Sequence, residues 1–214
     1  GIGTQVYAPE RAASTLGLEV IRELASRRDV LSTQASDHHC REELAALTEH
    51  SLLVAALARQ ICIAKNCNSD TVNQAYAAGI LHDLGRMFTC LIGQDSEEDE
   101  TAKHAQAGAW LLKLWGLPSP IATAVAFHHT PGKAGLSGMG PLAAIHLADV
   151  FAHEFAPPRF ETRSELDQAY MKETGLSSSL EDLRMLCEVS VFADLRREIA
   201  AARVKRYCDT SRGE

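Results

Sequence analysis

The sequence lacks three features that would each indicate a particular class of protein: an excess of positive charge, a long apolar run and a signal peptide. Its formal net charge is −7, whereas a surface that follows nucleic-acid phosphates needs clustered Lys and Arg. No apolar run approaches the roughly 18 residues of a membrane span. The opening residues 1–5 lack a charged region that leads into an apolar one. We therefore expect no nucleic-acid partner, no membrane segment and a cytoplasmic location.

The cysteines also lack the close spacing of a CxxC pair, which redox motifs and many zinc sites contain. They are spread along the chain, and most lie in apolar patterns that are typical of helices. Thiols in such surroundings are usually reduced in a cytoplasmic protein. We therefore expect free thiols at all the cysteine positions: Cys40, Cys62, Cys67, Cys90, Cys187 and Cys208.

No alternating strand pattern persists anywhere, and apolar residues recur instead at steps of three and four, as on one face of a helix. Hydrophobic residues make up 46% of the chain and charged residues 23%, which is ordinary for a soluble globular domain. The predicted fold is all-α. Gly85 is expected at a helix end, and Trp110 and Trp115 as core anchors. The predicted helices cover residues 48–64, 71–82, 103–115, 118–129, 142–154, 164–173 and 179–205.

The most informative feature that is present is the pair His82-Asp83, which closes the apolar stretch 75–81. Further imidazole and carboxylate side chains precede and follow this pair. Both are ligands that suit Zn, Fe, Mn or Ni, and neighbouring ions of this kind can share the charge of a phosphoryl group. In a helical chain, this ordered set predicts a site for one or two divalent ions. Its ligands would be His50, His82, Asp83, His104, His128, His129 and Asp149.

The predicted helices divide these ligands into two groups. Adjacent side chains on a regular helix diverge by about 100°, but at a helix end His82 and Asp83 can both turn towards an ion. Asp83 is best placed to bridge two ions, because a carboxylate has two oxygens. Helices of a bundle can bring distant ligands together. The first group would consist of His50, His82, Asp83 and Asp149, and the second group of His104, His128 and His129.

Several of these residues also have a simpler interpretation, which the sequence leaves open. His82-Asp83 could be a hydrogen-bonded pair at a helix end, and His104 could be a surface residue. One of His128 and His129 could be purely structural.

Two further histidines, His146 and His153, share the helical face of Asp149, at spacings of three and four residues. Neither belongs to the ordered set of ligands. We expect both to pack in the core or to support the ligands, rather than to bind metal themselves.

The order of the ligands resembles the metal-binding pattern of the HD superfamily of metal-dependent phosphohydrolases. Within this superfamily, the sequence of residues 104–131 and 141–149 is similar to the HDOD domain. That domain is a bacterial signal-transduction relative of the HD-GYP cyclic-di-GMP phosphodiesterases. The resemblance covers residues 1–155 and is most specific over residues 79–149. It implies an HD-domain-like helical bundle.

The resemblance also implies how the chain is divided. Residues 1–155 would form the HDOD-like domain, and residues 156–214 a C-terminal helical extension that packs on it. In the HDOD pattern, helices precede the segment that residues 1–17 resemble, so we expect the N-terminal part of the domain to be missing here. We expect either that this N-terminal region is disordered or removed, or that a surface groove remains where the absent helices would cover Ile2, Val6, Leu16 and Leu18.

Three departures from the HD-GYP pattern bear on function. Residues 130–135 stand in place of the Gly-Tyr-Pro motif, and Arg86 stands in place of a Lys that contacts phosphate. Arg86 is still cationic and can fork onto a phosphate group. Ala46 stands where some HD-GYP sites carry a carboxylate one helical turn before the first His, so we do not expect three metals.

Two functions remain open. The missing Gly-Tyr-Pro motif and the lack of a basic substrate loop favour a bacterial signalling module, such as the output domain of a response regulator. It would bind a signalling protein or an upstream receiver domain. The alternative is a metal-dependent phosphohydrolase or phosphodiesterase that acts on a nucleotide such as cyclic-di-GMP. In that enzyme, Asp83 would orient a metal-bound water and Arg86 would stabilise charge on the phosphate.

Overall fold

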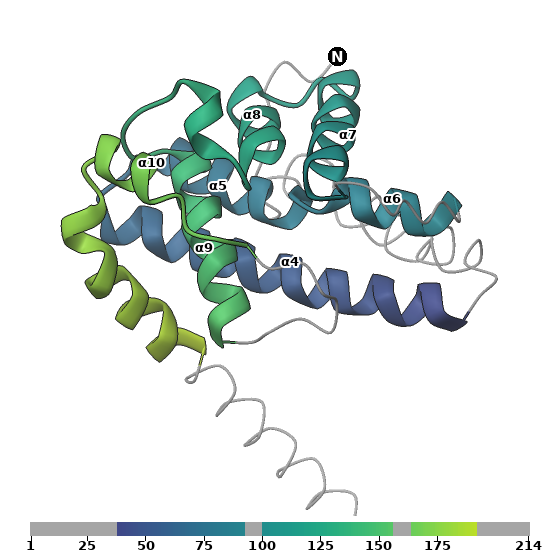
Figure 1. The fold of residues 1–214 in the computed structure, drawn as a ribbon, viewed down its shortest axis with the longest axis horizontal. Helices are drawn as coiled ribbons and strands as arrows, with labels where there is room; N and C mark the ends of the chain where they lie inside the picture. Colours follow the sequence, from purple (N-terminus) through teal and green to yellow (C-terminus); the bar gives the residue numbers. More distant parts are fainter. Residues whose placement is uncertain (1–37, 93–99, 156–163, 192–214) are drawn as a thin grey trace, which may run out of the picture.

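The chain forms an α-helical bundle around one apolar core, as the sequence predicts (Figure 1). The computed structural model describes residues 38–92, 100–155 and 164–191, and no strand occurs within these ranges. Residues 180–191 form a last helical stretch. The other elements are α4 (His38–Ala64), α5 (Ser69–Leu81), α6 (Leu84–Ile92), α7 (Glu100–Leu114), α8 (Ser119–Phe127), α9 (Pro141–Phe155), α10 (Gln168–Glu173) and the 3₁₀ helices η1 (Pro131–Ala134) and η2 (Ser177–Ser179).

Helix α4 runs along the length of the molecule and contacts α5, α6 and α9 (Figure 1). It begins at His38, well before the predicted start at Thr48, because the intervening Glu-, Leu- and Ala-rich stretch has high helix propensity. Leu47, Val54 and Ile61 recur along one face of α4, and all three are fully buried. This apolar stripe is what the other helices pack against.

Helix α4 also corrects the expectation that no stretch has the length and hydropathy of a membrane span. By these two measures alone, Cys40–Ala64 is long and apolar enough. Half of its apolar window is buried inside the molecule, where residues of α4 share the core with the other helices. The core helix of a bundle has the same composition, and we therefore interpret α4 as the central helix of this one.

A backbone contact sets the distance between α5 and α4. A Cβ atom on Gly79 of α5 would lie 2.5 Å from the Ala55 Cα and 2.8 Å from the Ala55 nitrogen of α4. Only glycine allows so close an approach. The contact brings the end of α5, which His82 follows, beside the part of α4 that carries His50. The centroids of these two imidazole rings lie 5.2 Å apart.

The sequence does not predict α6, and the expectation for Gly85 is wrong. Gly85 lies inside α6 rather than at a loosened helix end, and it is not one of the glycines with positive φ. A Cβ atom on Gly85 would overlap the carbonyl oxygen of His104, and Gly108 of α7 lies against Gly85 as well. The glycine therefore permits close packing of α6 on α7, which brings His104 towards Asp83.

Helices α7 and α8 lie side by side, and α8 also packs on α9 (Figure 1). Helix α7 ends just before Gly116, whose φ of 75° is the left-handed conformation expected of a glycine after a helix. The expectation that Trp110 and Trp115 anchor the core is wrong, because their side chains are 64% and 58% exposed. The buried face of α7 consists instead of smaller residues such as Ala109 and Leu112.

The described C-terminal residues pack on the same core, to which they contribute Tyr170 and Met171. The helix predicted from Ser164 begins only at Gln168, because the Asp167 carboxylate caps it by accepting a 3.0 Å hydrogen bond from the Tyr170 N–H. The boundary near residue 155 stays a prediction. The expectations for residues 1–18, 192–205 and Cys208 lie outside the described residues.

The cysteines do not all stay reduced. Cys40 near the start of α4 and Cys90 near the end of α6 form a disulfide, with their Cα atoms 5.9 Å apart. The expectation of free thiols is wrong for this pair, because α6 folds back along α4 and brings together two residues that are distant in sequence. Cys62, Cys67 and Cys187 are free, as expected.

Candidate metal centre

His82 and Asp83 lie in the short turn between α5 and α6, so the predicted helix end is present. His82 is the C-cap of α5, and the Asp83 carbonyl accepts hydrogen bonds from the N–H groups of Arg86 and Met87 at 2.9 and 3.1 Å. The two side chains are only 1% and 3% exposed. The change of direction between the helices lets both point into the bundle.

Asp83 reaches both predicted groups of ligands. Its Oδ2 atom lies 3.3 Å from His82 Nε2, and its Oδ1 atom lies 3.3 Å from His104 Nε2. One carboxylate therefore contacts an imidazole of the first group and an imidazole of the second. This is the arrangement that a carboxylate bridging two ions requires.

Asp149 of α9 lies beside the two histidines of the first group. Its Oδ1 atom is 3.0 Å from His50 Nε2 and 3.8 Å from His82 Nε2. His50 comes from α4 and His82 from the end of α5, so three elements that are far apart in sequence supply these atoms. The structure thus brings the four residues of the first group together.

The second group is also brought together, by α7 and the end of α8. His129 Nε2 lies 3.3 Å from His104 Nε2, and the rings of His128 and His129 have centroids 3.9 Å apart. One potential ligand atom from each of these three residues lies within 4.8 Å of the others. His128 also forms such a set with His82 and Asp149, so the two groups are continuous.

Two buried imidazoles turn their Nε2 atoms towards the centre. His82 Nδ1 donates to the Gly79 carbonyl and His128 Nδ1 to the Val125 carbonyl, both at 2.8 Å. These bonds place a proton on Nδ1, so Nε2 is the ring atom that each residue can offer to a metal. Within the described residues, neither Nε2 atom has a hydrogen-bond partner, and neither has Asp149 Oδ2. Such buried atoms are costly unless a cation satisfies them, so these residues fit a metal ion.

The carboxylates dominate the electrostatics of the first group. Burial alone would raise the pKa values of Asp83 and Asp149, but the surrounding imidazoles hold both well below the usual carboxylate range. Burial would lower the pKa of His82, but Asp83 and Asp149 raise it to about 9. The first group therefore attracts positive charge.

In the second group, the pKa values of His128 and His129 are lowered instead of raised. Burial lowers the pKa of His128 well below its ordinary value, and the neighbouring His129 lowers it further. Burial also lowers the pKa of His129, to about 4, and His104 adds to the effect. His128 and His129 are therefore neutral at pH 7, with lone pairs that are available to a metal.

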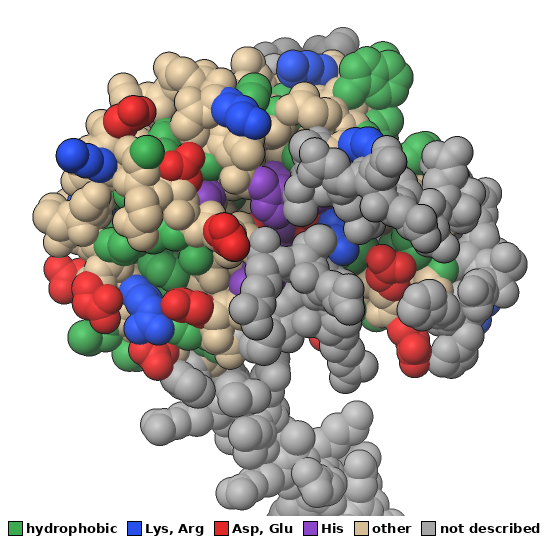
Figure 2. Space-filling model, in the orientation of Figure 1, with side chains coloured by type: hydrophobic (Ala, Val, Ile, Leu, Met, Phe, Trp, Pro, Cys, Tyr) green, Lys and Arg blue, Asp and Glu red, His purple; other side chains and the backbone are tan. Residues whose placement is uncertain are grey.

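His153 is the residue that the sequence interpretation undervalued. Its Nδ1–H donates to the Asp149 carbonyl at 2.8 Å and lies 3.2 Å from the Asp149 Oδ1 atom, so it orients that carboxylate. It also forms a possible ligand set with His50 and Asp149. Its spacing of four residues after Asp149 was the available signal. His129 and His153 are partly exposed, and histidine side chains are visible near the middle of the face in Figure 2.

Comparison with known families agrees with this geometry. The model of the HDOD domain matches residues 1–99. Residues 1–99 are thus similar to the HDOD domain. No curated protein and no solved structure matches the chain. The HDOD match includes α4, α5 and α6, and thus His50, His82, Asp83 and Arg86. The other expected ligands follow on α7, α8 and α9, beyond the matched residues but within the same bundle.

Proposed function

We propose that this HDOD protein is a bacterial signal-transduction module that retains an HD-type metal centre. One observation carries the proposal: buried imidazole and carboxylate atoms face one another, and the imidazoles of His82 and His128 are held by hydrogen bonds that their Nδ1–H groups donate to backbone carbonyls. Such support of ligands by neighbouring groups is a general property of metal sites. The HDOD match supports the signalling role, because this family is a signalling relative of metal-dependent phosphohydrolases.

The centre would hold one or two divalent ions of the Fe, Mn, Zn or Ni type. The first ion would bind the first group, and a second ion the second group, with Asp83 between them. Mixed imidazole and carboxylate donors suit these metals better than Mg or Ca, which prefer oxygen alone. His153 would orient the Asp149 carboxylate through its Nδ1 atom, which lies 3.2 Å from Asp149 Oδ1.

Signalling is favoured over catalysis by what stands in place of the Gly-Tyr-Pro motif. Residues 131–134 form the short helix η1, whose Pro131 is buried and whose single cation, Lys133, is exposed. This stretch offers little positive charge to a dinucleotide. The partner would be a signalling protein or an upstream receiver domain in the cytoplasm.

One observation favours hydrolysis as the second candidate. Asp83 contacts both ligand groups, and Arg86 follows it by one turn of α6 with its side chain 6% exposed. A bound metal would supply a water of lowered pKa and a Lewis acid for a phosphoryl oxygen. In that enzyme, Asp83 would orient the water and the Arg86 guanidinium would stabilise charge on the phosphate.

The decisive experiment combines metal analysis of the purified protein with turnover assays on cyclic-di-GMP and on a generic phosphodiester, with Mn²⁺ or Fe²⁺ supplied. We expect one or two ions per chain and no turnover. Asp83→Ala should lose the ions, whereas Asp182→Ala, which removes an exposed carboxylate outside the centre, should keep them. Robust wild-type turnover would overturn the signalling proposal in favour of the hydrolase. Absence of metal from protein supplied with Mn²⁺, Fe²⁺, Zn²⁺ and Ni²⁺ in turn would overturn the metal centre.

A further inference from the structure

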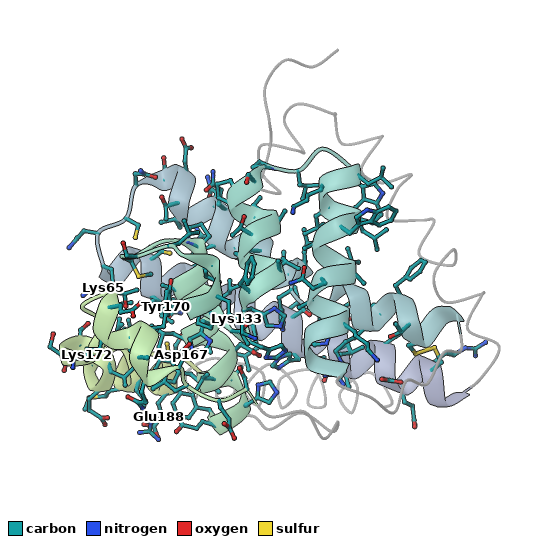
Figure 3. All side chains as sticks on the ribbon, turned by 45° about the horizontal axis from the view of Figure 1, so that its top comes forward. Lys65, Lys133, Asp167, Tyr170, Lys172 and Glu188 are labelled. Carbon is teal, nitrogen blue, oxygen red and sulfur yellow. A yellow bond between two sulfur atoms is a disulfide. The ribbon has the colours of Figure 1, made fainter. Side chains whose placement is uncertain are left out.

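His146 connects the C-terminal residues to the second group of ligands. It lies on α9, is fully buried, and uses both ring nitrogens. Its Nδ1–H donates to the backbone carbonyl of His128 at 2.7 Å. Its Nε2 accepts from the backbone N–H of Asp167 at 3.1 Å. Asp167 and Tyr170 mark the place where α10 meets the bundle (Figure 3).

The two hydrogen bonds depend on each other. The Asp167 N–H can only donate to Nε2 if that nitrogen carries no proton, so the proton of the neutral ring must lie on Nδ1. The bond to the His128 carbonyl needs the proton at the same place. The contact with Asp167 therefore selects the tautomer that holds His128.

The backbone carbonyl that accepts from His146 lies between two ligands of the second group. His128 is the C-cap of α8, and its carbonyl belongs to the peptide that joins His128 to His129, two ligands of the second group. Asp149 of the first group lies one helical turn after His146 on α9. Helix α9 is thus connected to both groups. It supplies Asp149 to the first group, and its His146 donates to the backbone carbonyl of His128 in the second.

We propose that His146 is a positioning residue, through which the docking of residues 164–173 sets the placement of His128 and His129 in the second group. Its consequence for metal binding rests on the proposed function. The positions of His128 and His129 are defined in the metal-free protein, so they can be measured whether or not the protein binds metal. Any partner that displaces α10 would thereby alter the second group and leave the first in place.

The most direct test of this role removes the backbone N–H of Asp167, which donates to His146. Asp167 has a φ of −75°, which proline adopts, and residues 164–167 lie outside any helix. Asp167→Pro removes both the cap carboxylate and the N–H that His146 accepts. Asp167→Ala removes the carboxylate alone and is the matched control. In the metal-free full-length chain, ¹⁵N-edited spectra of the imidazoles should show the Nδ1–H tautomer of His146 in the wild type and in Asp167→Ala. Asp167→Pro should populate the other tautomer and shift the His128 and His129 resonances.

The metal experiment uses Co²⁺, whose visible spectrum reports on the geometry of each site. Asp167→Pro should weaken the second equivalent of Co²⁺ by about 10-fold and change its spectrum, within the 10- to 100-fold range of such supporting residues. Binding of the first equivalent should stay unchanged. His146→Phe should give the larger loss, whereas His146→Asn, whose amide can still donate from the Nδ1 position, should restore most of the affinity.

The outcomes separate the two proposals. Identical imidazole spectra for Asp167→Pro and Asp167→Ala would overturn the role of His146, whatever the metal results are. A wild type that binds no Co²⁺ would count against the metal centre, and the imidazole spectra would still decide the placement. Equal losses at both equivalents in Asp167→Pro would show a general loosening of the bundle and would also overturn the role of His146.

Discussion

The two ligand groups lie next to each other but differ in charge. The first combines His50 and His82 with two carboxylates, and the pKa of His82 is raised to about 9. The second consists of imidazoles alone, and the pKa of its His129 is lowered to about 4. Burial lowers the pKa of both His82 and His129. The carboxylates reverse this effect for His82, whereas the neighbouring His104 adds to it for His129.

This difference predicts an order of occupancy. An ion entering the first group gains the attraction of Asp83 and Asp149, although it must displace a proton from His82. An ion entering the second group meets the neutral imidazoles of His128 and His129, and no carboxylate belongs to this group itself, although Asp83 Oδ1 lies 3.3 Å from its His104. Opposite charge is attracted strongly in a buried site, so we expect the first group to bind more tightly.

Replacement of Asp83 should produce the largest effect, because both groups depend on it. In Asp83→Ala, binding of both ions should fall below detection in a metal titration followed by elemental analysis. Asp83→Asn keeps the shape but removes the charge, and it should retain at most weak binding at the first group. An Asp83→Ala protein that still binds one ion tightly would show that the carboxylate does not bridge.

Gly85→Ala should damage the second group through the backbone. The added methyl would overlap the His104 carbonyl oxygen, so α7 must move and take His104 away from Asp83. Overpacking of this kind costs about 1–3 kcal/mol. We expect loss of the second ion and a lower denaturation midpoint. Gly140→Ala adds the same methyl where no atom lies within 4 Å, and its midpoint should match the wild type. Equal midpoints for both variants would refute the close-packing explanation.

His104→Ala should weaken only the second ion. It removes one ligand without moving the backbone, and we expect the second dissociation constant to rise by at least about 10-fold, in line with losses at metal sites. The first dissociation constant should change little. Isothermal titration with Mn²⁺ measures both. A matching loss at the first ion would mean that the two groups form one site.

The last effect is one of pH, and it should differ between the groups. Below pH 9 a proton occupies His82 in the metal-free protein, so the apparent affinity of the first group should rise from pH 7 to 9, by up to about tenfold per unit, and then level off. His129, with a pKa of about 4, has already lost its proton, so the second group should show no such rise. Parallel pH profiles for the two ions would contradict the electrostatic difference.

The sequence predicts helices and ligands well, for identifiable reasons. Periodic apolar residues place α4, α5, α8 and α9 to within a few residues at most ends, and the ordered His and Asp residues do converge. Helix α6 escapes prediction because it is short and follows the His82-Asp83 turn directly. The true role of Gly85 depends on the backbone of α7, which no local pattern reveals. The exposure of Trp110 and the disulfide of Cys40 depend in the same way on how helices pack.

The contact between Gly79 and Ala55 limits how this module can change shape. A slide of α5 along α4 by one turn would carry the glycine away and press the side chain of Ala75 or Tyr76, which lie on the same helical face, into the Ala55 backbone, where there is no room for a Cβ atom. The two helices must therefore move as one rigid body. A conformational signal in this protein would have to arise at an interface made by side chains, such as the one between α9 and the residues around α10, and the α4–α5 pair would serve as its fixed frame.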